Sequence, residues 1–191
     1  MATFQIKEKM FSLGGKFTIT DQTGLPCYHV EGSLFPLPKT FKVFDEEGHL
    51  ISQIEKKVLS FLPKFNVTLA NGNHFTIKKD FSFLKPHYTI EDLDMEVKGN
   101  FWDMDFQLLK DNQVIANISQ QWFRMTSTYQ VEVYNETYND LTISLVIAID
   151  YVKELEKKCI KLILGENNER IIVCTNPPNV VGFLEIQRTF R

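Results

Sequence analysis

The 191-residue chain is poor in the residue types that build disulfide frameworks and metal centres. It has an odd number of cysteines and no C-x-x-C pair; the three are Cys27, Cys159 and Cys174. Its four histidines are isolated and show none of the spacings of metal ligands. These shortages argue against a disulfide-rich secreted protein and against the common zinc motifs, and a reducing cytoplasmic location fits best.

Sequence motifs of catalysis and targeting are also missing. No serine lies in a G-x-S-x-G pattern, and Gly15-Lys16 lacks the upstream glycine of a phosphate-binding loop, because Met10 occupies that position. The first ten residues contain no apolar run of the signal-peptide type. We therefore expect a non-enzymatic, cytoplasmic protein without a cofactor.

Neither sign of charge dominates, because the chain has 21 basic and 24 acidic residues and a net charge of −3. General nucleic-acid binding requires an excess of positive charge and is disfavoured. The charges are unevenly distributed along the chain. Residues 1–90 carry 11 basic and 8 acidic groups, whereas residues 91–154 carry 4 and 12. If these stretches form separate faces, only the first can meet an anion.

The sequence does contain a series of short segments in which hydrophobic and polar residues alternate. Phe65, Val67 and Leu69 alternate with polar residues and lead into Asn71-Gly72, a strong hairpin signal. Similar segments separated by turn residues fill most of the first 134 positions. Many short strands with a two-residue period predict an all-β sandwich or barrel.

Two parts of the chain resemble each other. A shift of 64 residues superposes Ile54 on Ile118 and Val67 on Val131, and before the intervening turn the shift becomes 65. The one-residue difference falls in a turn, where a deletion leaves the faces of the strands unchanged. The interpretation is a duplicated β unit, and chance similarity between hairpins is the alternative.

The segment LTISLVIAIDYV, residues 141–152, breaks the two-residue period because it is apolar on nearly every side. Its length favours a helix over a buried strand, and Asn139 or Asp140 can cap its start. Twelve helical residues span only about 18 Å, which is too short to cross a bilayer. We expect a helix over about 140–154 that is surrounded by protein.

Three segments carry a resemblance to a known family: FKVFDEEGHLISQIEKKVLSF, NQVIANISQQWF…TYQVEVY and the apolar helix. They look like the bacterial YxjI / LURP-one-related family of the tubby C-terminal-like superfamily, which includes phospholipid scramblases. The resemblance implies a closed antiparallel barrel of about twelve strands around the hydrophobic helix. It covers residues 1–156, built from two similar halves, and leaves residues 157–191 as an extension of unclear role.

Within this resemblance, one group of residues is expected to be structural. Asp45 and Gly48 form the D-x-x-G turn, and Leu145 and Ile149 belong to the central helix. Asp150 ends the apolar run, and a lone buried carboxylate is costly. We therefore expect it to accept hydrogen bonds from the backbone or from tyrosines.

The resemblance implies a binding or scaffold module, for anionic phospholipid headgroups or for a protein partner. Tubby proteins bind phosphoinositides through cations on the barrel wall, and the candidates here are Lys57 and Lys79, with Lys7, Lys9 and Lys16. Ordinary solubilising lysines are the alternative. A scramblase-like transfer of lipid is a second functional hypothesis.

Scramblases are thought to have an acidic stretch just before their hydrophobic helix. The matching residues are Asn135, Glu136, Asn139 and Asp140, which makes them weak calcium candidates; helix capping is the alternative. A second acidic group, Asp92, Asp94 and Glu96, alternates with apolar residues. That pattern predicts a solvated strand face rather than a cation site. Neither the ligand nor the oligomeric state follows from the sequence.

Overall fold

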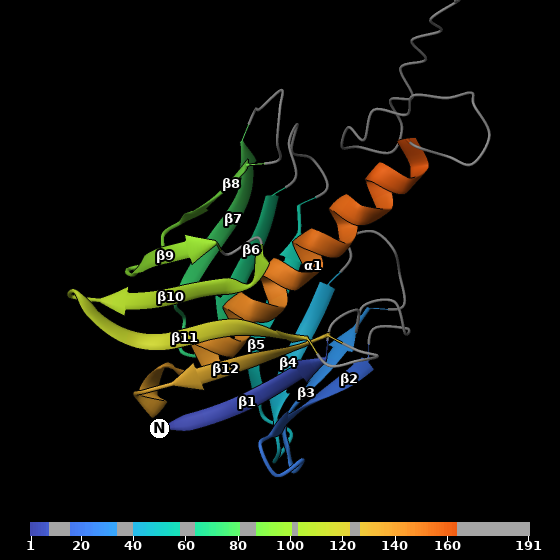
Figure 1. Ribbon diagram of the computed structural model, residues 1–191. Coiled ribbons are helices and arrows are strands. Elements are labelled where there is room, and N and C mark those ends of the chain that lie inside the picture. Colours follow the sequence, from blue (N-terminus) through green and yellow to red (C-terminus); the bar gives the residue numbers. More distant parts are fainter. Residues whose placement is uncertain are drawn as a thin grey trace, which may run out of the picture.

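A computed structural model describes residues 1–7, 16–33, 40–57, 64–80, 87–100, 103–122 and 127–163. It contains twelve strands followed by a single-turn 3₁₀ helix and one long helix (Figure 1). The elements are β1 (Ala2–Lys7), β2 (Lys16–Asp21), β3 (Pro26–Gly32), β4 (Thr40–Asp45), β5 (Leu50–Lys56), β6 (Lys64–Leu69), β7 (His74–Asp80), β8 (His87–Glu91), β9 (Glu96–Asn100), β10 (Asp105–Lys110), β11 (Gln113–Trp122), β12 (Ser127–Val133), η3 (Glu136–Tyr138) and α1 (Asn139–Ile163).

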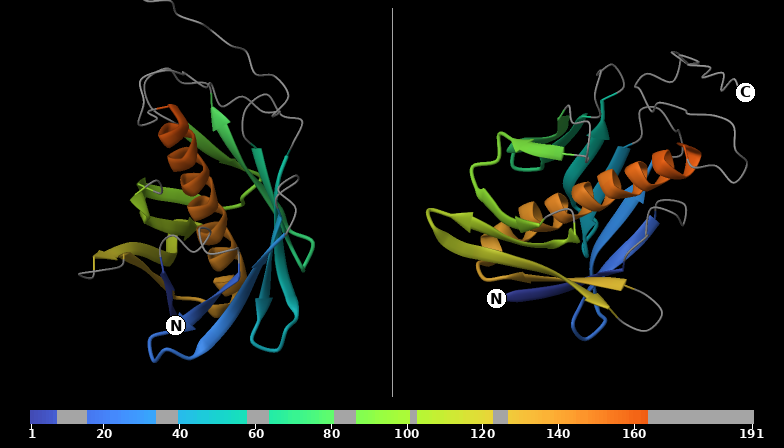
Figure 2. Two further views of the ribbon diagram at one scale, coloured as in Figure 1. Left: turned by 90° about the vertical axis from the view of Figure 1, so that its right-hand side faces the viewer. Right: turned by 45° about the horizontal axis from the view of Figure 1, so that its top comes forward.

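All twelve strands belong to one antiparallel sheet, with the order β8-β7-β6-β5-β4-β3-β2-β1-β12-β11-β10-β9. The pairing of β1 with β12 joins the start of the chain to the last strand, with Phe4 opposite Val131. The sheet curves around α1 (Figure 2). The expected mostly β fold of about twelve strands is therefore confirmed.

The expected closure of the barrel is not confirmed. Within the described residues β8 and β9 are the two edges of the sheet, and no hydrogen-bonded ladder joins them. In a closed barrel every strand pairs on both sides, whereas here each edge strand pairs on one side only: β8 with β7, and β9 with β10. The described strands thus curve around the helix without a ladder that closes them into a barrel.

The two similar parts of the sequence pair in the same register. Ile54 lies opposite Val67, and their counterparts Ile118 and Val131 also lie opposite each other. Both units contain a bulge at the corresponding place, between Val43 and Phe44 and between Leu108 and Leu109. The sequence shifts of 64 and 65 residues therefore describe equivalent positions in β4–β6 and β10–β12.

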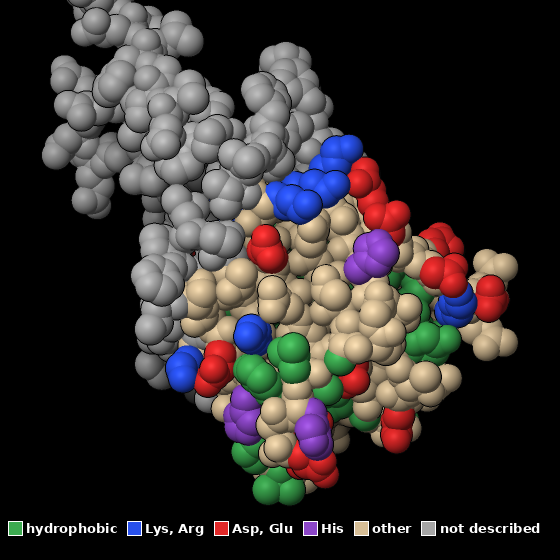
Figure 3. Space-filling view, turned by 180° about the vertical axis from the view of Figure 1, so that it is seen from behind, with side chains coloured by type: hydrophobic (Ala, Val, Ile, Leu, Met, Phe, Trp, Pro, Cys, Tyr) green, Lys and Arg blue, Asp and Glu red, His purple; other side chains and the backbone are tan. Residues whose placement is uncertain are grey.

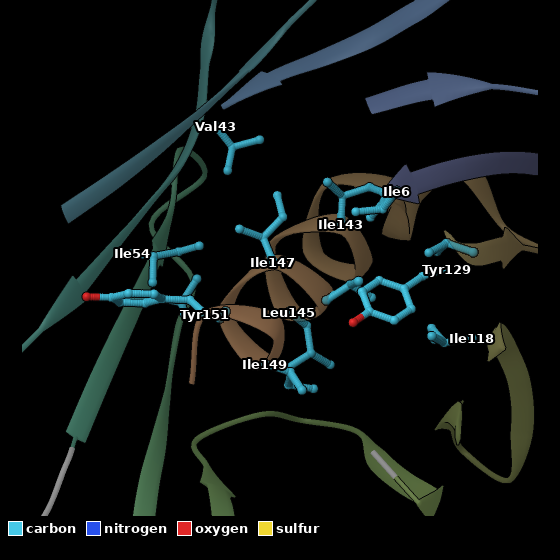
Figure 4. Close-up of a cluster of buried hydrophobic side chains, with 14 of the residues drawn as sticks. Ile6, Val43, Ile54, Ile118, Tyr129, Ile143, Leu145, Ile147, Ile149 and Tyr151 are labelled. Carbon is cyan, nitrogen blue, oxygen red and sulfur yellow. The ribbon is translucent and has the colours of Figure 1, made fainter. Parts of the chain in front are cut away.

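Helix α1 lies in the core, and every residue from Thr142 to Val152 is buried. In Figure 4, Ile147 points toward Val43, while Leu145 and Ile149 extend from another side of the helix. Leu145 and Ile149 are 0% and 1% exposed, so both pack in the centre. Burial on every side explains why this segment lacks a polar face.

The helix begins where the sequence indicates and continues further. It ends at Ile163 rather than near residue 154, so the boundary drawn at residue 156 falls inside α1. Leu155 and the residues after it mix lysine and glutamate with leucine and isoleucine, which a helix tolerates well. The rest of the proposed extension, residues 164–191, lies outside the described residues.

Candidate functional site

The antiparallel sheet gives the molecule two different ends. Five tight connections, between β2 and β3, β4 and β5, β6 and β7, β8 and β9, and β10 and β11, share one end with the start of α1; we call this the turn end. The opposite ends of the strands form the loop end, where β1 stops and β2 begins. Each strand residue can therefore be assigned a position between the turn end and the loop end.

Seven lysines of the strands and their immediate continuations lie at the loop end: Lys7, Lys16, Lys56, Lys57, Lys64, Lys78 and Lys79. The turn end is rich in acids: Asp21, Asp45, Glu46, Glu47, Asp92, Asp94, Asp111, Glu136 and Asp140. In Figure 3 cationic side chains gather near one rim of the displayed face. Most of the strand lysines and the clustered acids thus lie at opposite ends of the sheet, and the loop end also carries the acids Glu31, Glu55, Asp103 and Asp105.

Three of these lysines form a continuous row across adjacent strands, which we call the lysine row: Lys57, Lys64 and Lys78. Lys64 lies directly opposite Lys78 in the β6–β7 ladder. The amide of Lys57 donates to the carbonyl of Lys64 at 2.8 Å, which extends the β5–β6 ladder by one residue. Side chains at opposite positions lie about 5 Å apart at Cβ, so the three cations are neighbours.

The lysine row lies on the outer face of the sheet. Phe65 follows Lys64, and Ile77 precedes Lys78. Both side chains point into the core and are 1% and 0% exposed. Alternation then directs Lys64 and Lys78 outward, and Lys57 is exposed. The Nζ of Lys78 lies 3.2 Å from Glu91 Oε1, and Glu55 lies on the same face. Among the described residues, Glu55 and Glu91 are thus the carboxylates on this part of the outer face.

The other sequence candidates have different surroundings. The side chain of Lys79 lies outside the described part of the chain, so its role stays a prediction, whereas Lys78 lies on the outer face of β7. Lys16 forms an exposed ion pair with Glu31 at 2.9 Å. Lys7 ends β1 at the same rim, and Lys9 lies outside the described residues. The structure thus brings Lys57 together with Lys64 and Lys78.

The four calcium candidates make contacts of a structural kind. Asn135 caps η3 by accepting from the amide of Thr137 at 3.1 Å, and Glu136 pairs with the N-terminal amine at 3.3 Å. Asp140 accepts from the hydroxyl of Tyr28 at 3.0 Å. The buried Oδ1 of Asn139 has no hydrogen-bond partner in the part of the chain that the structure describes. These contacts favour the capping interpretation, and calcium binding stays a prediction.

The D-x-x-G turn is built around Asp45. Its carboxylate accepts from the amide of His49 at 2.7 Å and lies 3.0 Å from His49 Nδ1, while Glu47 lies 3.3 Å from the same nitrogen. Gly48 has φ +87°, a conformation that few other residues adopt easily. The hydrogen bonds of His49 lower the pKa of Asp45 against the opposing effect of burial, which is the largest single influence. The donor atoms of Asp45, Glu47 and His49 lie within 4.8 Å of one another, and their contacts stabilise the hairpin.

Asp150 is buried beside two other polar groups. The hydroxyl of Tyr129 donates to Asp150 at 2.8 Å, the type of partner expected for this carboxylate. Lys153, only 6% exposed, lies with its Nζ 5.4 Å from the centroid of the Tyr129 ring. The three groups connect the middle of α1 to β12.

Comparison with known proteins identifies the family. The LURP-one-related family model matches residues 2–150, which contain every strand and the first half of α1. The chain belongs to the LURP-one-related family. It is 30% identical over 144 residues to the uncharacterized protein YxjI of Bacillus subtilis (strain 168), an alignment that covers 75% of this chain and 88% of the relative. A solved structure of an Arabidopsis thaliana protein covers 78% of this chain and 92% of its own, with 13% identity and a TM-score of 0.47.

The LURP-one-related match includes the whole lysine row and excludes residues 151–191. None of the described helices combines the length and the apolar character that crossing a bilayer requires.

Lys64 and Lys78 are the members of the row that the sequence analysis did not select. Both are seven residues from Asn71, so the hairpin signal at Asn71-Gly72 already implies that they face each other.

Proposed function

We propose that this protein is a non-enzymatic binding module whose lysine row holds the headgroups of anionic phospholipids. The observation that carries the proposal is the register that places Lys57, Lys64 and Lys78 side by side on the outer face of β5, β6 and β7. Like charges at directly opposite positions destabilise a sheet. A bound anion relieves that repulsion, so the row favours phosphate-bearing ligands.

The position of the row supports a membrane surface as the source of the phosphate. The lysines lie at the loop end, and the turn end, with most of the clustered acids, is at the far side of the sheet. An approach with the loop end toward the bilayer brings the cations near the anionic surface and keeps those acids away from it. Each lysine near such a surface contributes about 1 kcal/mol, so three give about 3 kcal/mol and the binding is reversible.

Co-sedimentation with vesicles tests the proposal. The full chain is mixed with phosphatidylcholine vesicles, or with the same vesicles containing phosphatidylserine or a phosphoinositide, at low and physiological salt. We expect binding only with anionic lipid and weaker binding at higher salt, because ions screen exposed charges. Lys57→Glu with Lys64→Glu should weaken binding by about thirtyfold or more, at about 1 kcal/mol for each lysine removed.

The matched control is Lys42→Glu with Lys98→Glu, which removes the same charge from exposed positions on β4 and β9 outside the row. Equal losses for the two pairs would show that net charge, and not the row, controls binding. Absence of binding to every anionic vesicle contradicts the lipid proposal and directs the search to a protein partner.

Two further experiments test the calcium-binding and the scramblase-like hypotheses. Addition of calcium tests Glu136 and Asp140, whose substitution by glutamine and asparagine would abolish any calcium-dependent increase. A dithionite assay for lipid movement between leaflets separates binding from scramblase-like transfer, and we expect no accelerated movement. Transfer that depends on the lysine row would replace the binding-module proposal.

A further inference from the structure

The exposed hydrophobic side chains of the described residues gather at the turn end. Five large ones are exposed, and all five lie there: Met1, Leu25, Leu50, Val114 and Tyr134. Every connection between elements at this end lies within the described residues. Single exposed hydrophobic residues are common on any protein, but their accumulation at one end is typical of an interaction surface.

One of the five, Leu50, borders a hollow of about 240 Å³ where β5 and β6 meet the turn end. The equivalent of Ala70 in the other half of the sheet, 64 residues further along the chain, is Tyr134. The hollow is smaller than the range of about 300–1,000 Å³ that pockets for small molecules occupy, which favours a single side chain of a partner as its occupant. Its lining residues are Leu50, Ser52, Gln53, Thr68, Leu69 and Ala70.

The surroundings of the hollow are acidic. Glu46 and Glu47 are exposed in the turn that enters β5, and Glu46 forms no ion pair within the described ranges. Besides histidines, the described turn end holds two cationic groups, and both already face acids: Lys110 pairs with Asp94, and the N-terminal amine pairs with Glu136. This surface therefore repels anionic lipid and nucleic acid and attracts a cationic partner.

The backbone around the hollow is fully engaged. β5 pairs with β4 and β6, and β6 pairs with β5 and β7. Because neither strand has a free edge here, a partner cannot add a strand and must bind through its side chains. An amphipathic helix, which presents apolar and cationic side chains on adjacent faces, binds in this way.

We propose that the hollow beside Leu50 docks a basic amphipathic helix of another protein. An aliphatic side chain of the helix fills the hollow and contacts Leu50 and Ala70. A lysine or arginine on the same helix meets the carboxylates of Glu46 and Glu47. The inference is independent of the lipid proposal, because the lysine row and the hollow lie at opposite ends of the sheet and both can be occupied at once.

A model peptide tests the proposal on the full chain. The probe is a peptide of about 14 leucine and lysine residues with the apolar spacing of an amphipathic helix. NMR amide shifts of the labelled protein locate its binding, and we expect the largest shifts in residues 46–53 and 68–73. A peptide of the same composition, scrambled so that it has no apolar face, should bind at least about tenfold more weakly.

The internal repeat supplies a matched pair of variants. Leu50→Ser with Glu46→Gln should weaken binding of the helical peptide by about tenfold, because the variant loses the apolar anchor and a carboxylate together. Val114→Ser with Asp111→Asn makes the corresponding changes at the equivalent positions of the other half and should change the affinity by less than about twofold. All four residues are exposed, and unchanged thermal unfolding verifies that both variants fold.

Four results would overturn the proposal. Equal losses in the two variants would show that general charge and hydrophobicity, and not the hollow, control binding. Absence of peptide binding, or amide shifts centred elsewhere, would remove the hollow as the docking site. Self-association of the full chain that the Leu50→Ser, Glu46→Gln variant abolishes would identify a second copy as the occupant. The same variant should co-sediment with anionic vesicles as the unmodified protein does, and a loss there would make the hollow part of the lipid site instead.

Discussion

Tyr129 donates a 2.8 Å hydrogen bond to the carboxylate of Asp150 in the interior of the fold. The tyrosine belongs to β12 and is 0% exposed, and the aspartate belongs to the otherwise apolar face of α1 that meets this strand. A buried carboxylate is tolerated only when it has partners. The contact therefore fixes one rotation of the helix relative to the sheet.

Replacement of Asp150 should destabilise the protein through its neighbours. Asp150→Ala leaves the hydroxyl of Tyr129 without its acceptor and leaves the buried Lys153 near an empty site. We expect a loss of about 3 kcal/mol in the free energy of unfolding, measured with urea. Asp150→Asn keeps an acceptor and should lose less. A change below about 0.5 kcal/mol for Asp150→Ala would contradict this interpretation.

Two buried polar residues of α1, Thr142 and Ser144, should respond in opposite directions when their hydroxyl groups are removed. The buried hydroxyl of Thr142 has no hydrogen-bond partner among the described residues, so Thr142→Val should raise the free energy of unfolding by about 1 kcal/mol. The hydroxyl of Ser144 bonds to Ser52 at 2.7 Å and to the carbonyl of Asp140 at 2.6 Å. Ser144→Ala should lower the stability by about 1 kcal/mol, and thermal unfolding of both variants measures the contrast.

The β2–β3 hairpin should lose part of its stability in acid. The hydrogen bond from the hydroxyl of Thr23 at 2.7 Å, opposed by burial and supported by the amides of Leu25 and Thr23, lowers the pKa of Asp21. Because the folded pKa is depressed, this contribution is present above the unfolded pKa, about 3.9, and disappears as the pH falls through the lower folded value.

Thr23→Val provides the test of this linkage. The substitution removes the hydroxyl donor and should move the pKa of Asp21 back toward its ordinary value. Titration of the carboxyl carbon by NMR measures the change. An unchanged pKa in Thr23→Val would show that the backbone amides alone hold the carboxylate.

Two glycines with left-handed backbones should differ in their tolerance of alanine. Gly48 has open space where a Cβ would be, so Gly48→Ala meets only the backbone strain, about 1 kcal/mol. At Gly99 the added Cβ would lie 2.8 Å from the carbonyl oxygen of Asp105. Gly99→Ala should therefore cost more, about 2 kcal/mol or above, and chemical denaturation of both variants compares them. Similar losses would mean that the β9–β10 pair moves apart easily.

Much of the fold could be predicted because its periodicities are local. Ile54 and Val67 alternate with polar neighbours, and the all-round apolar segment after Asp140 requires a surrounding wall. The end of α1 at Ile163 was not predicted, because the apolar run that marks the helix stops at Val152 and the sequence contains no comparable signal for the end of the charged continuation. The unpaired edges of the sheet could not be predicted either, because they depend on the geometry of the whole sheet and not on a local sequence pattern.

The sequence predicts the basic character of the candidate site but identifies only some of the lysines that form it. Adjacent lysines indicated a basic wall, but the outward orientation of Lys78 depends on which face of β7 is buried. The hairpin at Asn71-Gly72 fixes the partner of Lys64, and the burial of Ile77 decides the face. The row across three strands depends on two successive registers, so it becomes visible only when the strands are assembled.

The pairing of β1 with β12 has a consequence for the time course of folding. Ala2 lies opposite Val133, so the first strand cannot complete its ladder until more than 130 residues have been synthesised. The helix that fills the interior follows later still, from Asn139 onward. Contacts of such long sequence separation slow folding, into the range of milliseconds to seconds. Until α1 arrives, the nascent sheet exposes its apolar face, and during that interval the chain is most vulnerable to aggregation and most dependent on chaperones.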